Sequence, residues 1–249
     1  MKKILLILFV SLFQNFIFGA TITSTGTGGN WNATNSWVGG VIPTAADDVI
    51  IASGSTVIVT ADAFAKSINV SGGVLTINDS EILTVYGNVN VSSGGQFNAG
   101  TGNNDSAIIK VYGDFINLGT ANFWKSIVVI AGNLSTTSTI LQNNGNILVG
   151  GNVSGVIGGS GSGTVYPVNP NAAVTSTGSA DEKAAGTEPT DPVLVALMNE
   201  VIYGGNCSFT VNDITNVSTC SGLNAVFTVS TSGASSPAYQ WQINKNDGN

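Results

Sequence analysis

The carboxylates are the first residues whose types and spacing could support chemistry. Asp47 and Asp48 are adjacent, whereas general acid–base catalysis needs groups that converge on one substrate. Neighbouring residues of a strand point to opposite faces, so this pair predicts a turn or a cap. Asn78, Asp79 and Glu81 could offer oxygen ligands to Ca²⁺, but two carboxylates without a third make a weak site. We therefore expect no cofactor, with Ca²⁺ as the only candidate.

The charged residues are few and unbalanced, which excludes several classes of function. The chain has seven lysines, no arginine, no histidine and fourteen acids, with a formal net charge of −7. Histidine-dependent catalytic triads and histidine-ligated metals are excluded. Nucleic-acid binding is not expected, because neutralising phosphates requires clustered Lys and Arg. A polysaccharide lyase or hydrolase would need a basic groove or clustered aspartates, and neither is present, so we expect no enzyme.

Aromatic side chains are the remaining candidates for contact with a ligand. Trp31 and Trp37 lie among glycines and asparagines near the N-terminus. They could stack on a sugar, or they could cover the open end of a repeat stack, which needs an atypical terminal cap. We favour the cap, and we expect both indoles to be buried. Phe123, Trp124 and Lys125 interrupt the repeat pattern and predict an exposed contact loop.

The first twenty residues have the pattern of a secretion signal. Met1–Lys3 is a basic tip, and an apolar run from Ile4 to Phe13 precedes Gly19 and Ala20. The run is too short for a membrane span. We expect cleavage after Gly19 or Ala20, giving a secreted protein with no membrane insertion after cleavage.

Residues 47–165 carry the pattern of many short strands. Apolar and small polar residues alternate in segments such as Leu75–Asn78 and Val89–Ser92, and Gly, Asn and Ser separate the segments. A motif of the form apolar–x–Gly–(Asn/Asp)–apolar recurs at intervals of 26, 19 and 19 residues. Its glycines are Gly87, Gly113, Gly132 and Gly151. A return near every twenty residues is typical of one coil of a solenoid.

This recurrence favours an all-β fold, a right-handed parallel β-helix of roughly five coils over 47–165, with residues 21–46 as its N-terminal cap. Each repeat glycine would supply a corner conformation that other residues resist, and the Asn or Asp after it could form a ladder between coils. Tyr86 and Tyr112 precede such glycines, and we expect them to stack on each other. A β-sandwich is the alternative, although sandwiches rarely repeat one motif at a near-fixed interval.

The composition changes after the solenoid. Residues 166–190 are rich in Ala, Thr, Ser and Pro and predict a linker or a loose last coil. The only helical pattern follows over 191–204, with Asp191 as N-cap and Pro192 at the first helical position.

The C-terminal segment, residues 205–249, has alternating strands and a central Trp241, a pattern typical of the first part of an immunoglobulin-like sandwich. About half of such a domain is missing, so we expect a truncated or partial chain. Cys207 and Cys220 are the only cysteines, and an even pair in an exported chain suggests a disulfide. Cys220 could instead pair with a cysteine in the missing half of that domain.

Two parts of the chain resemble large secreted and surface proteins of the Bacteroidetes. The pattern Gly29-Asn30-Trp31, a second Trp followed by two glycines, a Pro, and Asp47-x-Val49-x-Ile51 is similar to the start of their β-helical regions. The segment from Cys220 to Gln242 is similar to the immunoglobulin-like repeats that follow there. Such proteins are typically adhesin-like and exported by the type IX system. Asp105-Ser106-Ala107 also resembles the site that these bacteria O-glycosylate, which predicts a modified Ser106.

Residue types and resemblance together predict a non-enzymatic, secreted or surface-displayed adhesin-like protein. Its β-helix would be a stalk or contact module followed by immunoglobulin-like repeats. The expected partners are a surface glycan or protein ligand and the secretion machinery. The alternative is a glycan-binding accessory region of a surface polysaccharide-degrading protein.

Overall fold

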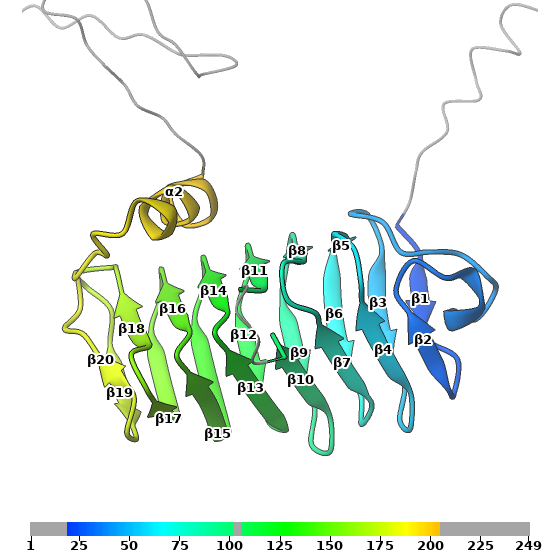
Figure 1. Ribbon diagram of the computed structural model, residues 1–249, viewed down its shortest axis with the longest axis horizontal. Helices are drawn as coiled ribbons and strands as arrows, with labels where there is room; N and C mark the ends of the chain where they lie inside the picture. Colours follow the sequence, from blue (N-terminus) through cyan, green and yellow to red (C-terminus); the bar gives the residue numbers. More distant parts are fainter. Residues whose placement is uncertain (1–18, 102–105, 205–249) are drawn as a thin grey trace, which may run out of the picture. The chain divides into compact units, whose positions relative to one another are not determined.

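The part of the chain that the structure describes forms a parallel β-solenoid of about seven turns and one short α-helix (Figure 1). The computed structural model describes residues 19–101 and 106–204. Residues 1–18 of the predicted signal peptide, the predicted immunoglobulin-like domain and both cysteines lie outside the described residues. All pairings between the named strands of the described part are parallel, for example β3 with β6 and β11 with β14. The predicted β-helix is confirmed, and the antiparallel sandwich alternative is wrong.

Most turns of the solenoid contribute one strand to each of three stacks. The first stack consists of β1 (Thr21–Thr23), β3 (Asp48–Ile51), β6 (Ser67–Val70), β9 (Val89–Val91), β12 (Phe115–Asn117) and β19 (Val174–Thr177). The second stack consists of β2 (Gly28–Asn30), β4 (Thr56–Val59), β7 (Val74–Ile77), β10 (Gln96–Ala99) and β13 (Thr120–Trp124). Two longer strands run through both stacks, β15 (Leu134–Asn143) and β17 (Val153–Ser160).

The third stack forms a separate sheet. Its strands are β5 (Ala63–Ala65), β8 (Ile82–Val85), β11 (Ile108–Val111), β14 (Ile127–Ile130), β16 (Asn146–Val149), β18 (Thr164–Pro167) and β20 (Asp181–Glu182). Alternate residues of each strand point inward, so the period-two pattern of the sequence becomes a continuous apolar core. Phe97, Phe115 and Phe123 lie in its centre with edge-to-face ring contacts, their centroids 5.3 to 6.2 Å apart.

The four repeat glycines lie above one another at one corner, as predicted, but for a different physical reason. None of them has a φ in the left-handed region. Each is instead too close to the coil before it for a side chain: a Cβ on Gly132 would lie 2.7 Å from the carbonyl oxygen of Gly113. The amide of Gly132 donates to that same oxygen at 2.9 Å. The corner therefore requires glycine because there is no room for a Cβ. The predicted reason, a backbone conformation that other residues resist, is wrong.

A ladder of side-chain hydrogen bonds runs along the same corner. The Asn88 Oδ1 accepts from the amide of Asp114 at 2.8 Å, and the Asp114 Oδ1 accepts from the amide of Asn133 at 2.7 Å. The Asn133 Oδ1 in turn accepts from the amide of Asn152 at 2.9 Å, and the Asn152 Oδ1 accepts from that of Ala173 at 2.8 Å. Each Asn or Asp thus satisfies a backbone donor of the next coil, which confirms the predicted ladder.

Trp31 and Trp37 lie at the N-terminal end of the stack, where the 3₁₀ helix η1 (Thr34–Ser36) separates them. Their exposed fractions are 1% and 2%, so the expected burial is confirmed. The rings meet edge to face at 5.0 Å, and the indole Nε1 of Trp37 donates to the carbonyl oxygen of Trp31 at 2.7 Å. The predicted cap also contributes strands of its own, because β1 and β2 pair with β3 and β4.

The segment 166–190 differs from the linker that its composition suggests. Strand β19 pairs with β17, and β20 pairs with β18, so the segment adds a further turn to the solenoid. Its polar composition hid these strands, since all four residues of β19 are at least partly exposed. The loose last coil was the better of the two predictions.

The predicted helix is present as α2 (Pro192–Val201). The Asp191 carboxylate accepts from the amides of Val193 and Leu194, which caps its first turn. Its apolar face covers the outer side of β14 and β16 (Figure 1). The buried side chains of this contact are Leu194, Leu197, Met198 and Val201 from the helix, Val129 and Leu148 from the sheet, and Val168 directly after β18.

We expect Gly132→Ala to destabilise the protein by about 1–3 kcal/mol, because a Cβ there must displace backbone of the preceding coil. Gly26→Ala is the matched control, since a Cβ on Gly26 would have no neighbour within 4 Å. Urea unfolding at 25 °C measures both. An equal effect of the two substitutions would contradict the steric account of the corner.

We expect Trp37→Phe to cost about 1–3 kcal/mol of unfolding free energy, because it leaves the buried carbonyl of Trp31 without its indole donor. Trp124→Phe is the control on an exposed tryptophan and is expected to change stability by at most about 0.5 kcal/mol. Denaturant midpoints of the three proteins test this. A Trp37→Phe variant as stable as the parent would show that the hydrogen bond contributes nothing to the cap.

Candidate functional site

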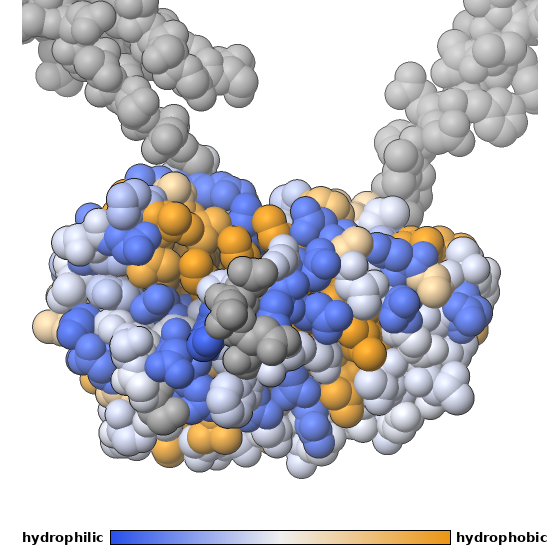
Figure 2. Space-filling view, in the orientation of Figure 1, coloured by the Kyte–Doolittle hydropathy of each residue, from blue (hydrophilic) through white to orange (hydrophobic). Residues whose placement is uncertain are grey.

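The outer face of the third stack is divided into a covered and an open part. Helix α2 covers β14, β16 and β18 and reaches β11, whose Ile108 packs against the same cluster, whereas the outer faces of β5 and β8 lie beyond it. In the space-filling view, hydrophobic side chains gather around α2, and further hydrophobic areas lie elsewhere on the same face (Figure 2). The outer face of the third stack therefore continues past the helix, and in this open part the helix does not cover its side chains.

Three aromatic side chains form what we term the aromatic surface. Phe64 on β5 and Tyr86 directly after β8 are exposed, whereas Tyr112 directly after β11 is partly buried against the helix. Phe64 is 45% exposed and Tyr86 is 50% exposed. The rings of Tyr86 and Tyr112 stack with centroids 5.4 Å apart and planes 14° apart. The predicted tyrosine stack is confirmed, and it holds the Tyr86 ring upright on the sheet.

Charged groups border the aromatic surface on the side of the helix. Lys110 on β11 donates to both carboxylate oxygens of Glu200 on α2, at 2.7 and 2.8 Å. Burial raises the pKa of Tyr112, and the negative charge of Glu200 and its hydrogen bond raise it further. The Tyr112 hydroxyl therefore stays protonated at neutral pH. Lys110 and Glu200 also fix the helix relative to the sheet at this border.

Residues 23–133 match a family described as a domain of unknown function, DUF8693. The DUF8693 match contains the cap tryptophans and all three rings of the aromatic surface, whereas α2 lies outside it. Comparisons with curated proteins and with solved structures give no match. The DUF8693 description assigns no activity, so chemical function rests on the residues themselves.

The predicted contact loop is not a single surface. Phe123 is fully buried in the core, and Trp124, the next residue of β13, points outward with 46% of its surface exposed. Lys125 is partly buried and has a φ of 45°, which turns the chain after the strand. Phe123 was wrongly placed because the strand continues through it, so alternation sends its ring inward. Trp124 remains an exposed aromatic, on the second stack rather than on the aromatic surface.

The other predicted site residues lie apart from the aromatic surface. Ser106 is half-buried directly before the buried Ala107, and its proposed sugar stays a prediction. The Asp79 carboxylate accepts from the amide of Thr101 at 2.8 Å, so it ties two coils together. Among residues 19–101 and 106–204, no group of three or more His, Cys, Asp and Glu side chains could hold a metal ion. Within the same ranges, no helix is long and apolar enough to cross a membrane.

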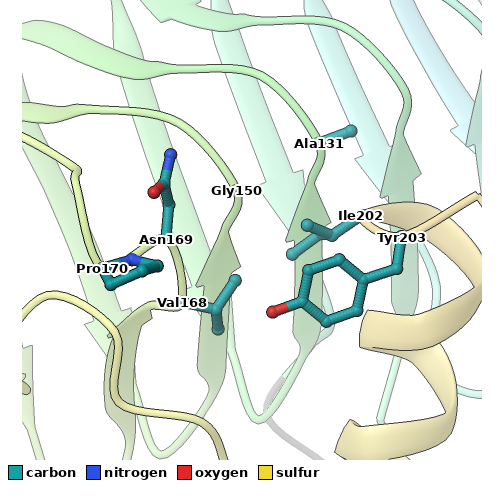
Figure 3. A pocket seen from close by; sticks show the side chains of 7 residues that line it. All are labelled: Ala131, Gly150, Val168, Asn169, Pro170, Ile202 and Tyr203. Atoms are coloured by element: carbon teal, nitrogen blue, oxygen red, sulfur yellow. The ribbon is translucent and has the colours of Figure 1, made fainter. Parts of the chain in front are cut away.

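One open hollow lies between α2 and the sheet (Figure 3). Its volume is about 230 Å³, which is below the roughly 300–1,000 Å³ of typical small-molecule sites. In Figure 3 the ring of Tyr203 borders it, and the Tyr203 hydroxyl donates to Glu188 at 2.8 Å. The lining residues are Ala131, Gly150, Val168, Asn169, Pro170, Ile202 and Tyr203. The hollow is a packing gap at the end of the helix and presents no convergent polar groups.

The two adjacent aspartates act separately, as their spacing predicts. Asp48 accepts from the Ser67 hydroxyl at 2.6 Å and pairs with Lys66 at 2.9 Å, and these contacts lower its pKa. Burial opposes ionisation of Asp47, but hydrogen bonds from the Thr44 hydroxyl and from the amides of Ala20 and Thr44 outweigh burial, so its pKa is also lowered. Both carboxylates therefore hold the first coil together.

The lowered pKa of Asp47 makes the first coil sensitive to acid. A carboxylate whose pKa is lowered by folding stabilises the fold above its ordinary pKa of 3.8, and this contribution is lost as the pH falls through the lowered folded value. We expect Asp47→Asn to be less stable than the parent at pH 7 and to lose less stability between pH 5 and about pH 2. Unfolding midpoints measured across that range test this. Parallel pH profiles for the two proteins would contradict the assignment.

Proposed function

We propose that the protein is a non-enzymatic, secreted or surface-displayed, adhesin-like protein whose solenoid is a stalk and contact module. The aromatic surface is the observation that carries this proposal. Exposed rings on a rigid sheet offer apolar faces that need no rearrangement to bind, which reduces the entropic cost of association. The absence of histidine and the scattered lysines support a binding role over a catalytic one.

The ligand class that fits the aromatic surface best is a neutral glycan. A sugar ring has apolar C–H faces that can stack on Phe64 and Tyr86, and hydroxyls that can bond to the Tyr112 hydroxyl and to Glu200 at the border. Acidic glycans fit poorly, because the chain has a net charge of −7. Export through the type IX system and immunoglobulin-like repeats after the solenoid complete the proposal, on the basis of the sequence resemblance.

The alternative proposal is a glycan-binding accessory region of a surface polysaccharide-degrading protein. The same aromatic surface favours it, because either role requires a sugar to be held without being cleaved. The two proposals differ in the rest of the protein, where a sorting domain with further immunoglobulin-like repeats favours adhesion and a hydrolase module favours degradation.

We expect Tyr86→Ala to weaken binding of neutral oligosaccharides about tenfold, which corresponds to about 1.4 kcal/mol, because it removes the most exposed ring of the aromatic surface. A glycan array identifies the ligand, and calorimetric titration with that ligand measures the change. Trp124→Ala is the control, since it removes a similarly exposed aromatic from another stack.

Two outcomes would contradict the proposal. If Trp124→Ala weakens binding and Tyr86→Ala does not, the aromatic surface is not the contact site. If no neutral glycan binds and a protein ligand is recovered that depends on Tyr86, the surface is a contact site for a different class of partner. Thermal unfolding of each variant confirms that the solenoid is intact.

A further inference from the structure

The backbone of Ala20 is held by hydrogen bonds at the start of the solenoid. Its nitrogen donates to the Asp47 Oδ1 at 2.8 Å, and the carbonyl oxygen of Ala20 accepts from the amide of Asp48, also at 2.8 Å. Strand β1 begins at the next residue, Thr21. The backbone of Ala20 is therefore held by the first coil through both its nitrogen and its carbonyl oxygen.

The carboxylate that receives this nitrogen is fixed in place. Its second oxygen, Oδ2, accepts from the Thr44 amide at 2.8 Å and from the Thr44 hydroxyl at 2.6 Å. The Asp47 amide donates back to the Thr44 carbonyl at 3.1 Å, which closes the turn. Asp47 is 8% exposed, a low value for a carboxylate, and its Oδ1 accepts from the uncharged amide of Ala20. Such a group is well suited to a cation.

The residue before Ala20 can only be glycine in this arrangement. A Cβ on Gly19 would lie 1.6 Å from the carbonyl oxygen of Ala46, so the chain leaves the coil directly against that carbonyl. Small residues before the scissile bond are also what signal-peptide processing requires.

We infer that the mature protein begins at Ala20 and that Asp47 is a binding site for its α-ammonium group. This inference rests on the proposed export of the chain. Hydrolysis of the Gly19–Ala20 peptide bond by a signal peptidase consumes one water and leaves a carboxylate on Gly19 and an amine on Ala20. The amine is protonated at neutral pH and converts the neutral N–H···O bond to Asp47 into an ion pair. Processing therefore strengthens the closure of the capped end of the solenoid.

The cleavage position is tested by exporting the full chain from a bacterial host and sequencing the N-terminus of the released protein. A start at Ala20 is expected. A start at Thr21 or at another position overturns the inference while leaving export intact. A chain that stays unprocessed in the cells contradicts the export proposal itself and, with it, the processing step.

The ion pair is tested without export, on chains that begin at Ala20 and run to Asn249. We expect the chain with a free α-amine to melt about 2 °C higher than the same chain N-acetylated. This difference should vanish in Asp47→Asn and persist in Asp62→Asn, whose carboxylate likewise accepts from a backbone amide of the next coil, that of Ile82 at 3.0 Å. Equal melting temperatures for the free and acetylated parent chains would overturn the inference.

The pH dependence of the two melting temperatures tests the ion pair on the parent sequence alone, without any substitution. The Asp47 carboxylate faces the amine. The next residue, Asp48, is paired with Lys66. An amine whose pKa is raised by Asp47 stabilises the fold below its ordinary pKa of about 7.7–8.0 and loses this effect as the pH rises through the raised value. The free and acetylated chains should therefore converge at high pH. A difference that is constant from pH 6 to pH 10 would contradict an ionic origin.

Discussion

The close stacking of parallel coils is the constraint on which the rest of this structure depends. Each coil hydrogen-bonds to the next at the same positions, so any residue type that the spacing demands must recur at every turn. At one corner the spacing leaves no room for a Cβ, and glycine recurs there. The following Asn or Asp then supplies the side-chain oxygen that the next coil needs. The repeat in the sequence is thus a direct record of the distance between coils.

This constraint explains what could be predicted from the sequence. Corner residues such as Gly132 and Asn133 must repeat, so they revealed the solenoid and the ladder. Strands β19 and β20 were missed because a last turn buries little, and its sequence therefore loses the apolar alternation. The predicted reason for the corner glycines was also wrong. A sequence shows that glycine recurs, but not whether it is needed because a Cβ would clash or because the backbone has a positive φ.

The candidate site was less predictable because it depends on which face of a strand a residue occupies. Phe123 and Trp124 are adjacent aromatics with opposite environments, one in the core and one in solvent, and a one-residue uncertainty in the strand end exchanges them. Tyr86 and Tyr112 were easier to place, because both precede a corner glycine and stack at the coil spacing. It could not be predicted that α2 packs against Tyr112 and leaves Tyr86 exposed, because this depends on where the helix meets the sheet.

The two ends of a solenoid expose unpaired strand edges, and here the N-terminal end is closed by interactions that the repeat cannot supply. Trp31 and Trp37 fill the space inside the first turn, and Asp47 holds the backbone of Ala20 against its edge. Both devices act on the same turn, so loss of either should loosen the cap before the coils beyond it. The aromatic surface begins on β5, in the first full coil after the cap, with Phe64. A rigid capped end therefore supports the flat face on which the proposed contact depends.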